Sequence, residues 1–478
     1  MKAGFVTMRR ATLVAGMALL IAGCASPGIP VIEEATPAGW HAPVFAHQGD
    51  NAQLQNWWGQ FNDPALNQVL SAAQAASPDI ATARSRVFEA RVAAAASRDE
   101  LYPRVGLSAS ALRGVPDPTT PLNTTVSAGL QARWVLDLMG GRSASARQAN
   151  AQADQTLAGW HEARVLVAAQ AARSYFGYRV CQEQLSVAGA DRDSRTATAQ
   201  SSEITEKAGL TAPAVAALAR ASRSEGIARY ALQAATCEAQ VKAMVAMTGM
   251  AETDLRALLS QETAWPDPAA VQGALAVTEV PASVLRQRPD IFRAQRSLMA
   301  AADGVNVSRA ALWPSISLSG SALRNRTSVD GVSLNYNTWT VGPIQLEIPL
   351  LGRSALHADV RASKAKYEAA ASAYAGALRQ AVAEVEQSLV TLDSLNERSE
   401  QTQVSFEGYA QSFNGTEARY SVGLASLSDL EEARRLRLAS ASAVVGLRLE
   451  RINAWIDLYV ALGGGFDPEH IESPKDPT

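Results

Sequence analysis

Two cysteines, Cys181 and Cys237, have a spacing that could allow them to form a disulfide. Cys181 lies 28 residues before Gly209, and Cys237 lies 28 residues after it. Gly209 belongs to a turn signal, Ala208-Gly209-Leu210-Thr211, between two stretches rich in helix formers. If two antiparallel helices join at this turn, the equal distances bring the two thiols side by side. In an oxidising compartment this spacing predicts a Cys181–Cys237 disulfide, and the alternative is a pair of buried free thiols.

A second set of residues that could do chemistry follows the turn signal at Gly423. Here Ser428-Asp429-Leu430-Glu431-Glu432-Ala433-Arg434-Arg435 places carboxylates beside guanidinium groups. Ion pairs of this kind can hold neighbouring helical hairpins together, and carboxylates that converge on an axis form a ring that attracts cations. The plainer interpretation is a set of exposed ion pairs between residues three and four apart on one helix.

No set of residues supports an enzyme. The five histidines are scattered, at His41, His47, His161, His357 and His470, and no zinc-protease, phosphate-loop or nucleophile-elbow motif occurs. We therefore expect no metal site and no cofactor. A net charge of −3 gives no indication of a nucleic-acid or anionic-lipid partner.

The N-terminus has the pattern of an export signal. Arg9 and Arg10 precede a short apolar run that ends in Ile21-Ala22-Gly23-Cys24. The residues before Cys24 resemble the bacterial lipoprotein box, which implies a signal peptide at 1–23 and a lipid on Cys24; Ala25 then favours the outer membrane. The alternative is an ordinary signal peptide with an incidental cysteine. No other apolar run approaches the roughly 20 residues of a spanning helix, so a membrane crossing would use strands.

One stretch of the chain occurs twice. Pro-Asp-Ile begins at Pro78 and Pro289, Leu-x-Pro at Leu101 and Leu312, and Gly-Arg-Ser-Ala at Gly141 and Gly352, each pair 211 positions apart. Three landmarks at one separation predict a tandem duplication.

Each copy changes from a helical to an alternating pattern. From Val126 to Leu136 apolar and polar residues alternate, which is typical of a strand with one apolar and one polar face. We expect β-hairpins at about 103–136 and 314–350, with a bulge or an edge at Pro343. The strands are about long enough for a tilted barrel strand of roughly 9–11 residues. Two hairpins on an ordinary soluble sheet are the alternative.

Long helices without proline follow each hairpin and turn back at Gly209 and Gly423. Two antiparallel helices of this length would bury each other's apolar stripe as a coiled coil. The expected organisation is a signal peptide at 1–23, an extended segment at 24–62, a first repeat at 63–259, a linker at 260–288, a second repeat at 289–465 and a tail at 466–478, with helical hairpins at about 143–249 and 355–463.

Several short motifs are distributed along the chain between Trp57 and Gly465. They are Trp57-Trp58-x-x-Phe61-x-Asp63-Pro64, Ser77-Pro78-Asp79-Ile80, Asp137-Leu138-x-Gly140-Gly141, Arg286-Gln287-Arg288-Pro289-Asp290-Ile291, Trp313-Pro314-Ser315-Ile316, Ile348-Pro349-Leu350 and Leu458-Tyr459-Val460-Ala461-Leu462-Gly463-Gly464-Gly465. Together they resemble the TolC/OprM-like outer-membrane efflux proteins, and in particular the NodT-type lipoproteins. The resemblance implies a homotrimer with a twelve-stranded β-barrel, a helical periplasmic tunnel, a periplasmic adaptor and an inner-membrane pump, commonly of the RND type.

The resemblance also implies a periplasmic gate. The family closes its tip with Leu-x-x-x-Asp-Ala-x-Arg just past the second turn. In this chain Ser428 stands at the Leu position, Glu432 at the Asp and Arg435 at the Arg, with Asp429 beside them. The glutamate keeps the charge of an ionic gate, whereas Ser428 removes its hydrophobic part.

Membrane strands would require an oligomer, because four strands cannot close a barrel and an open edge in lipid leaves backbone groups unpaired. Three chains give twelve strands, the smallest number with useful room for a lumen. We expect a mainly α fold with long helical hairpins and four transmembrane strands per chain, acting as the exit duct of a tripartite efflux system. The alternatives are a duct for type I protein secretion and a lipid-anchored coiled-coil scaffold without a pore.

Overall fold

The computed structural model describes residues 40–43, 56–115, 121–261, 263–275, 285–469 and 473–474. The predicted signal peptide and lipid attachment at Cys24 lie outside these residues. The chain divides into two compact units. The first contains Ser85–Leu157 and Arg293–Gly376, and the second contains Thr36–Arg84, Ala158–Phe292 and Ala377–Thr478. No helix in the described part of the chain is long and apolar enough to cross a membrane.

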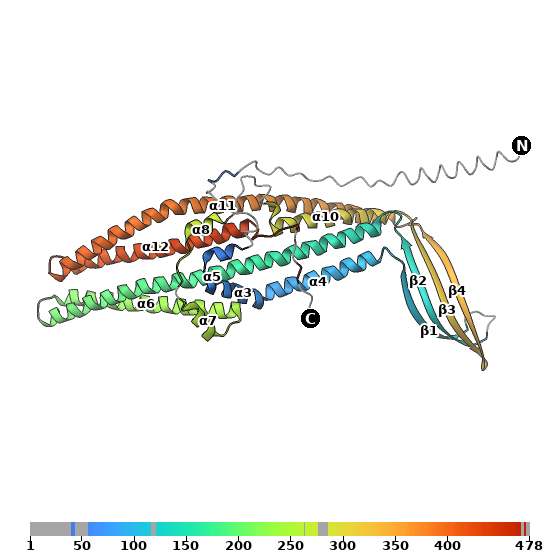
Figure 1. The fold of residues 1–478 in the computed structure, drawn as a ribbon, viewed down its shortest axis with the longest axis horizontal. Coiled ribbons are helices and arrows are strands. Elements are labelled where there is room, and N and C mark those ends of the chain that lie inside the picture. Colours follow the sequence, from blue (N-terminus) through green and yellow to red (C-terminus); the bar gives the residue numbers. More distant parts are fainter. Residues whose placement is uncertain are drawn as a thin grey trace. The chain divides into compact units, whose positions relative to one another are not determined.

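The fold is mainly helical with one antiparallel sheet, as the sequence predicted (Figure 1). The helices are η1 (Trp57–Phe61), α3 (Pro64–Ala76), α4 (Pro78–Asp99), α5 (Gly141–Lys207), α6 (Pro213–Thr248), α7 (Glu252–Leu259), α8 (Pro268–Gly273), α10 (Pro289–Ala310), α11 (Arg353–Ser421) and α12 (Leu427–Ala461). The strands are β1 (Arg104–Gly114), β2 (Asn123–Leu136), β3 (Ser315–Val329) and β4 (Val332–Glu347).

The sheet lies in the first unit and has the order β1-β2-β3-β4. Each strand pairs with the next in antiparallel register, so β1 and β4 are its two edges. The register shifts where Ser319 of β3 lies opposite both Gly342 and Pro343 of β4. The expectation of a bulge or an edge at Pro343 is therefore confirmed in both respects.

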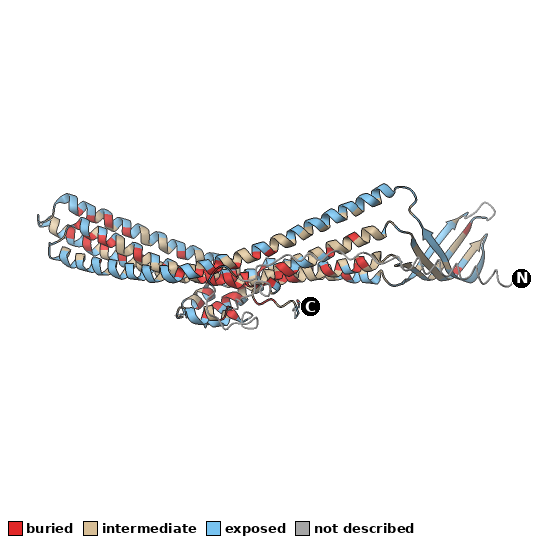
Figure 2. Cartoon of the chain, turned by 90° about the horizontal axis from the view of Figure 1, so that it is seen from above, coloured by how far each residue is buried: buried red, intermediate tan, exposed pale blue. Residues whose placement is uncertain are grey.

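The two faces of the sheet differ in polarity. Residues paired across antiparallel strands share a face, so Leu107, Leu130 and the residues in register with them lie together. That face carries mainly Val, Leu, Ile, Ala and Trp, and the opposite face carries mainly Ser, Thr, Gln and Asn. In Figure 2 the strands are mostly exposed or half-buried, because a single layer buries neither face within one chain.

In the second unit, the long helices reverse direction at glycines with left-handed backbone. Gly209 has φ +72° and Gly423 has φ +77°. In both turns the residue after the glycine donates a backbone hydrogen bond to the carbonyl five residues earlier, from Leu210 to Thr205 and from Leu424 to Arg419, at 2.8 Å each. A side chain at either glycine would be strained, which explains why glycine ends both helices.

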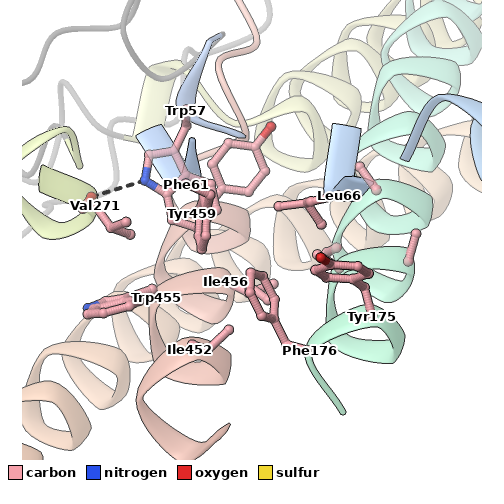
Figure 3. Close-up of a cluster of buried hydrophobic side chains, with 14 of the residues drawn as sticks. Trp57, Phe61, Leu66, Tyr175, Phe176, Val271, Ile452, Trp455, Ile456 and Tyr459 are labelled. Atoms are coloured by element: carbon pink, nitrogen blue, oxygen red, sulfur yellow. Dashed lines mark hydrogen bonds between the residues drawn. The ribbon is translucent and has the colours of Figure 1, made fainter. Parts of the chain in front are cut away.

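The core of the second unit gathers where short elements pack on the long helices (Figure 3). Trp57 of η1 is fully buried, stacks on Tyr459 of α12 at 4.6 Å between ring centroids, and donates through Nε1 to the Val271 carbonyl of α8 at 3.1 Å. Residues 260–288, expected as a linker, therefore contribute a core helix. Phe466, expected in the polar tail, is also buried, against Ala158 and Phe292.

Asp63, the acidic residue of the motif from Trp57 to Pro64, forms several hydrogen bonds. Its carboxylate accepts hydrogen bonds from the backbone N–H groups of Ala65 and Leu66 and so caps α3. It also accepts from the Tyr175 hydroxyl at 2.7 Å and from Arg179 at 3.3 Å, both on α5. Burial and this carboxylate raise the pKa of Tyr175 to about 12. Asp63 thus ties the chain entering α3 to α5.

Candidate functional site

The start of α12 carries the predicted gate residues, and one of them caps the helix. The Asp429 N–H donates to the Ser426 hydroxyl at 3.1 Å, and the Asp429 carboxylate accepts from the Ser426 N–H at 2.9 Å. This capping box satisfies free N–H groups of the first turn. The hydrogen bonds from Ser426 hold the pKa of Asp429 below its usual value of 3.8. Asp429 therefore stabilises the N-terminal end of its own helix, α12.

Glu432 and Arg435 form an exposed ion pair on α12. The guanidinium of Arg435 donates to both carboxylate oxygens of Glu432, at 2.6 and 2.9 Å. Ser428 is also exposed and lies on the same face, since the spacings of four and three follow the helical period. The hydrogen bonds from Arg435 hold the pKa of Glu432 below its usual value of 4.5. Three of the predicted gate residues, Ser428, Glu432 and Arg435, thus form a polar face that the second unit leaves uncovered.

The other face of α12 carries Glu431 and Arg434, which are turned inward. Arg434 is 2% exposed and donates to the hydroxyls of Ser194 and Thr198 of α5, at 3.1 and 2.9 Å, as well as to Glu431. Burial lowers the pKa of Arg434. The acidic and basic run after Gly423 is therefore split by helix geometry into an exposed half and a buried half.

Arg195 of α5 connects that buried half to the first hairpin. It is 5% exposed and donates to Asp191 at 2.9 Å, to the Ser222 hydroxyl of α6 at 2.7 Å and to Glu431 at 3.0 Å. One network of hydrogen-bonded charges thus joins α5, α6 and α12. The sequence predicted ion pairs between hairpins, but no motif in it pointed to Asp191 or Arg195. Their spacing of four, with opposite charge, was the only available signal, and it recurs on many surface helices.

Cys181 of α5 and Cys237 of α6 are joined by a disulfide in the structure, with Cα atoms 5.6 Å apart. Both side chains are buried. The bond crosses the first helical hairpin well away from its turn at Gly209. It fixes the register of α5 against α6.

Two of the sequence motifs contact each other at the end of α12. Arg288, from the Arg-Gln-Arg-Pro-Asp motif, donates to the Ala461 carbonyl at 2.7 Å and to Asp290 and Glu384 at 2.8 and 2.6 Å. Burial lowers the pKa of Arg288, but the two carboxylates outweigh it, so the pKa lies above its usual value. Gly463 has φ +89°, and a Cβ there would lie 2.1 Å from the Gln287 carbonyl oxygen. The two motifs therefore fit together backbone to backbone.

On the polar face of the sheet, side chains of neighbouring strands form hydrogen bonds with each other. Ser127 of β2 donates to the Asn325 side chain of β3 at 2.6 Å, and Asn325 donates to the Thr338 hydroxyl of β4 at 2.8 Å. Hydroxyl pairs at 2.9–3.0 Å continue this face at Thr125 with Thr327 and Ser321 with Thr340. The sheet thus has apolar side chains on one face and hydrogen-bonded polar side chains on the other, a pattern that strands between lipid and water also have.

The fold is that of known outer-membrane channels. The chain is similar to the CmeC outer membrane channel of Campylobacter jejuni, with a TM-score of 0.80 and 22% sequence identity over 93% of this chain and 96% of that one. At this identity the likeness concerns the fold alone.

The sequence itself defines the family. The family model described as outer membrane efflux protein matches residues 69–250 and 280–464, more than half of the chain. The chain therefore belongs to the outer membrane efflux protein family, and the predicted family resemblance is confirmed. It is similar to the pyoverdine export outer membrane protein OpmQ of Pseudomonas aeruginosa, with 28% identity over 97% of this chain and 98% of that protein. It is also similar to nodulation protein T of Rhizobium leguminosarum bv. viciae, with 28% identity over 90% of this chain and 88% of that protein.

Proposed function

We propose that three copies of this chain form a passive exit duct through the outer membrane, the last stage of a tripartite efflux system. The main support for this proposal is the sheet, which has one apolar face, one polar face and two free edges, β1 and β4. In lipid, free edges cost several kcal/mol for each unpaired backbone group, about as much as an unsatisfied buried amide. Pairing of β4 with β1 of the next copy closes a twelve-stranded barrel whose polar face lines water.

The helical hairpins continue the duct into the periplasm in this proposal. Their exposed tip, with Glu432 and Arg435, forms the gate, and the charged face of α12 is turned toward the same face of the other two copies. A periplasmic adaptor and an inner-membrane pump, commonly of the RND type, deliver small molecules to it. The name of one relative, OpmQ, describes export of pyoverdine through an outer membrane protein, which supports a transport role for this chain. The function is therefore passage and gating.

Two further parts of the proposal concern the chain itself. A lipid on Cys24 anchors the mature protein in the outer membrane. The two halves arose by tandem duplication, which is supported by the two separate stretches that match the family, 69–250 and 280–464. Both halves contain a β-hairpin followed by a helical hairpin.

The test is the mass and conductance of the full acylated chain extracted in mild detergent. A particle of three chains that produces single-channel currents in planar bilayers is expected. A stable monomer without channel activity would overturn the proposal, and channel-free assemblies would favour the scaffold.

A further inference from the structure

The apolar face of the sheet changes character toward the turns at the ends of the hairpins. Along β3 and β4 its successive cross-strand pairs are Ile316 with Leu346, Leu318 with Ile344, Gly320 with Val341, Ala322 with Trp339, Arg324 with Asn337, and Arg326 with Asn335. The first four pairs are apolar and the last two are basic and polar. On the neighbouring strands the same change occurs where Arg113 of β1 pairs with Thr124 of β2.

The register places these arginines on the lipid side and not on the polar side. Arg326 is in register with Val126 of β2, and Arg324 is in register with Ala128. Both of these β2 residues belong to the apolar set that runs to Leu136. Since paired residues share a face, Arg113, Arg324 and Arg326 extend the lipid-facing surface at one end. We call these three residues the outer arginines.

The outer arginines are exposed. None of them forms an ion pair with a residue in the described part of the chain. Arg326 donates to the Ser333 hydroxyl at 3.4 Å. Among the described strand and turn residues of the sheet, the carboxylates are Asp330, in the β3–β4 turn, and Glu347, at the other end of β4. Within the described residues, the three outer arginines therefore outnumber the one carboxylate at their end of the sheet, Asp330.

A tryptophan marks the boundary between the apolar and the basic parts. Trp339 is 78% exposed and lies on the same face, in the pair next to Arg324 and Asn337. Trp side chains gather at the level of lipid headgroups, where the ring meets both hydrocarbon and water. The outer arginines thus lie one step beyond the hydrocarbon, at headgroup height. Arg324 and Arg326 are about 6.7 Å apart along their strand, close enough to act on one headgroup.

We propose that the outer arginines bind the phosphate groups of phosphorylated glycolipids in the outer leaflet of the membrane. This inference rests on the proposed barrel. Guanidinium groups suit phosphate oxygens because they donate in pairs, and Asn335 and Asn337 supply further donors beside them. Each chain of the trimer adds the same patch, so the barrel carries a basic ring around its outer rim. The bound lipid seals the barrel at the level where the apolar face ends.

The test measures lipid binding to the purified trimer by native mass spectrometry. The probes are bis-phosphorylated lipid A, its monophosphoryl form, phosphatidylcholine and inorganic phosphate. We expect the bis-phosphorylated lipid to bind at least about tenfold more tightly than the monophosphoryl form, and the preference to shrink as salt is raised. Equal binding of the two lipid A forms would overturn the inference. Equally tight binding of inorganic phosphate would assign the patch to a free anion and also overturn it.

The variants are the pair Arg324→Gln and Arg326→Gln, the charge-keeping pair Arg324→Lys and Arg326→Lys, and the control Arg133→Gln. Arg133 lies on the polar face of the same sheet, in register with Ser319. The glutamine pair is expected to lose the preference and the control to keep it. The lysine pair is expected to keep part of it, because lysine retains the charge but not the paired donors. An unchanged preference in the glutamine pair contradicts the inference. If the glutamine pair does not form trimers, the comparison of the two lipid A forms on the unchanged trimer decides. Absence of a trimer in the unchanged protein would instead refute the proposed function.

Discussion

Arg195 of α5 donates a hydrogen bond at 3.0 Å to Glu431 of α12, a residue 236 positions further along the chain. The Arg195 side chain is 5% exposed and the Glu431 side chain 18%. This contact joins the first helical hairpin to the second near the tips of both. The exposed face of α12 that carries Glu432 and Arg435 therefore lies opposite a buried network of charges on the same helix.

Removal of one partner from this network should destabilise the second unit. We expect Arg195→Met to cost about 3 to 5 kcal/mol, because it leaves Asp191 and Glu431 without their shared cation. Thermal unfolding of the purified protein measures the loss. The control Arg435→Met removes an exposed arginine of the same region and should leave the unfolding midpoint unchanged. Equal effects of the two changes would contradict a structural role for the buried network.

The gate can be tested through Glu432. We expect Glu432→Ala to raise single-channel conductance in planar bilayers. In the proposed gate, the Glu432 carboxylate holds Arg435 and narrows the ring of charged side chains, and the variant removes this carboxylate. The control is Glu397→Ala, since Glu397 is an exposed carboxylate of α11 away from the tip. Unchanged conductance in Glu432→Ala would argue against the gate.

The gate should also respond to acid. The pKa of Glu432 lies below its usual value of 4.5 because Arg435 donates hydrogen bonds to its charged form. A carboxyl whose pKa is lowered keeps its ion pair above the usual value and loses it only as the pH falls below the lowered one. Conductance should therefore stay constant from neutral pH down to about 4.5 and rise under more acidic conditions. A rise already complete between pH 7 and 5 would show that another group controls the gate.

The disulfide predicts a stability difference between oxidised and reduced protein. Cys181 and Cys237 enclose a loop with a sequence separation of 56, for which a crosslink contributes about 2 to 4 kcal/mol. Reduction should lower the unfolding midpoint, and the double change Cys181→Ser and Cys237→Ser should match reduced protein. If both thiols can be alkylated without a reductant, and the peptide map does not change on reduction, the bond is absent from the native protein.

Gly463 offers a sharp test of the contact between the two motifs. A methyl group at this position meets the Gln287 carbonyl and forces a residue with a side chain to φ +89°. We expect Gly463→Ala to reduce the yield of folded protein severely, because left-handed strain costs about 1 to 3 kcal/mol before the clash is counted.

The matched control for that change is Gly446→Ala in the middle of α12. No heavy atom lies within 4 Å of the Cβ that it would add. Alanine favours a helix over glycine, so this change should be neutral or stabilising by about 0.5 to 1 kcal/mol. A Gly463→Ala protein as stable as Gly446→Ala would show that the motifs do not pack as described.

Local signals in the sequence predicted the features that depend on neighbouring residues. The turns at Gly209 and Gly423 follow from glycine at helix ends, and the bulge beside Pro343 follows from a slip in the period of two. Equal distances from one turn brought Cys181 near Cys237. These features depend on helix and strand periods, which are local properties of the sequence.

Features that depend on distant packing were not predictable in the same way. Nothing local distinguishes Arg195 from the many exposed arginines of the long helices, and only the approach of α12 buries it. Val271 lies in a proline-rich stretch that predicts a linker, and only the folded chain brings Trp57 close enough to donate to its carbonyl. Likewise, the outer arginines could be assigned to the apolar face only after the register of β3 against β2 was known.

Pairing of β4 of one copy with β1 of the next is what the proposed barrel requires most directly. Ser110→Cys on β1 and Thr338→Cys on β4 both lie on the polar face, in register with Ser127 and Leu323. We predict that a short bismaleimide crosslinker, applied to membranes that contain the double variant, joins chains in a ladder that ends at three. A chain that remains monomeric, or a ladder that continues past three, would contradict it.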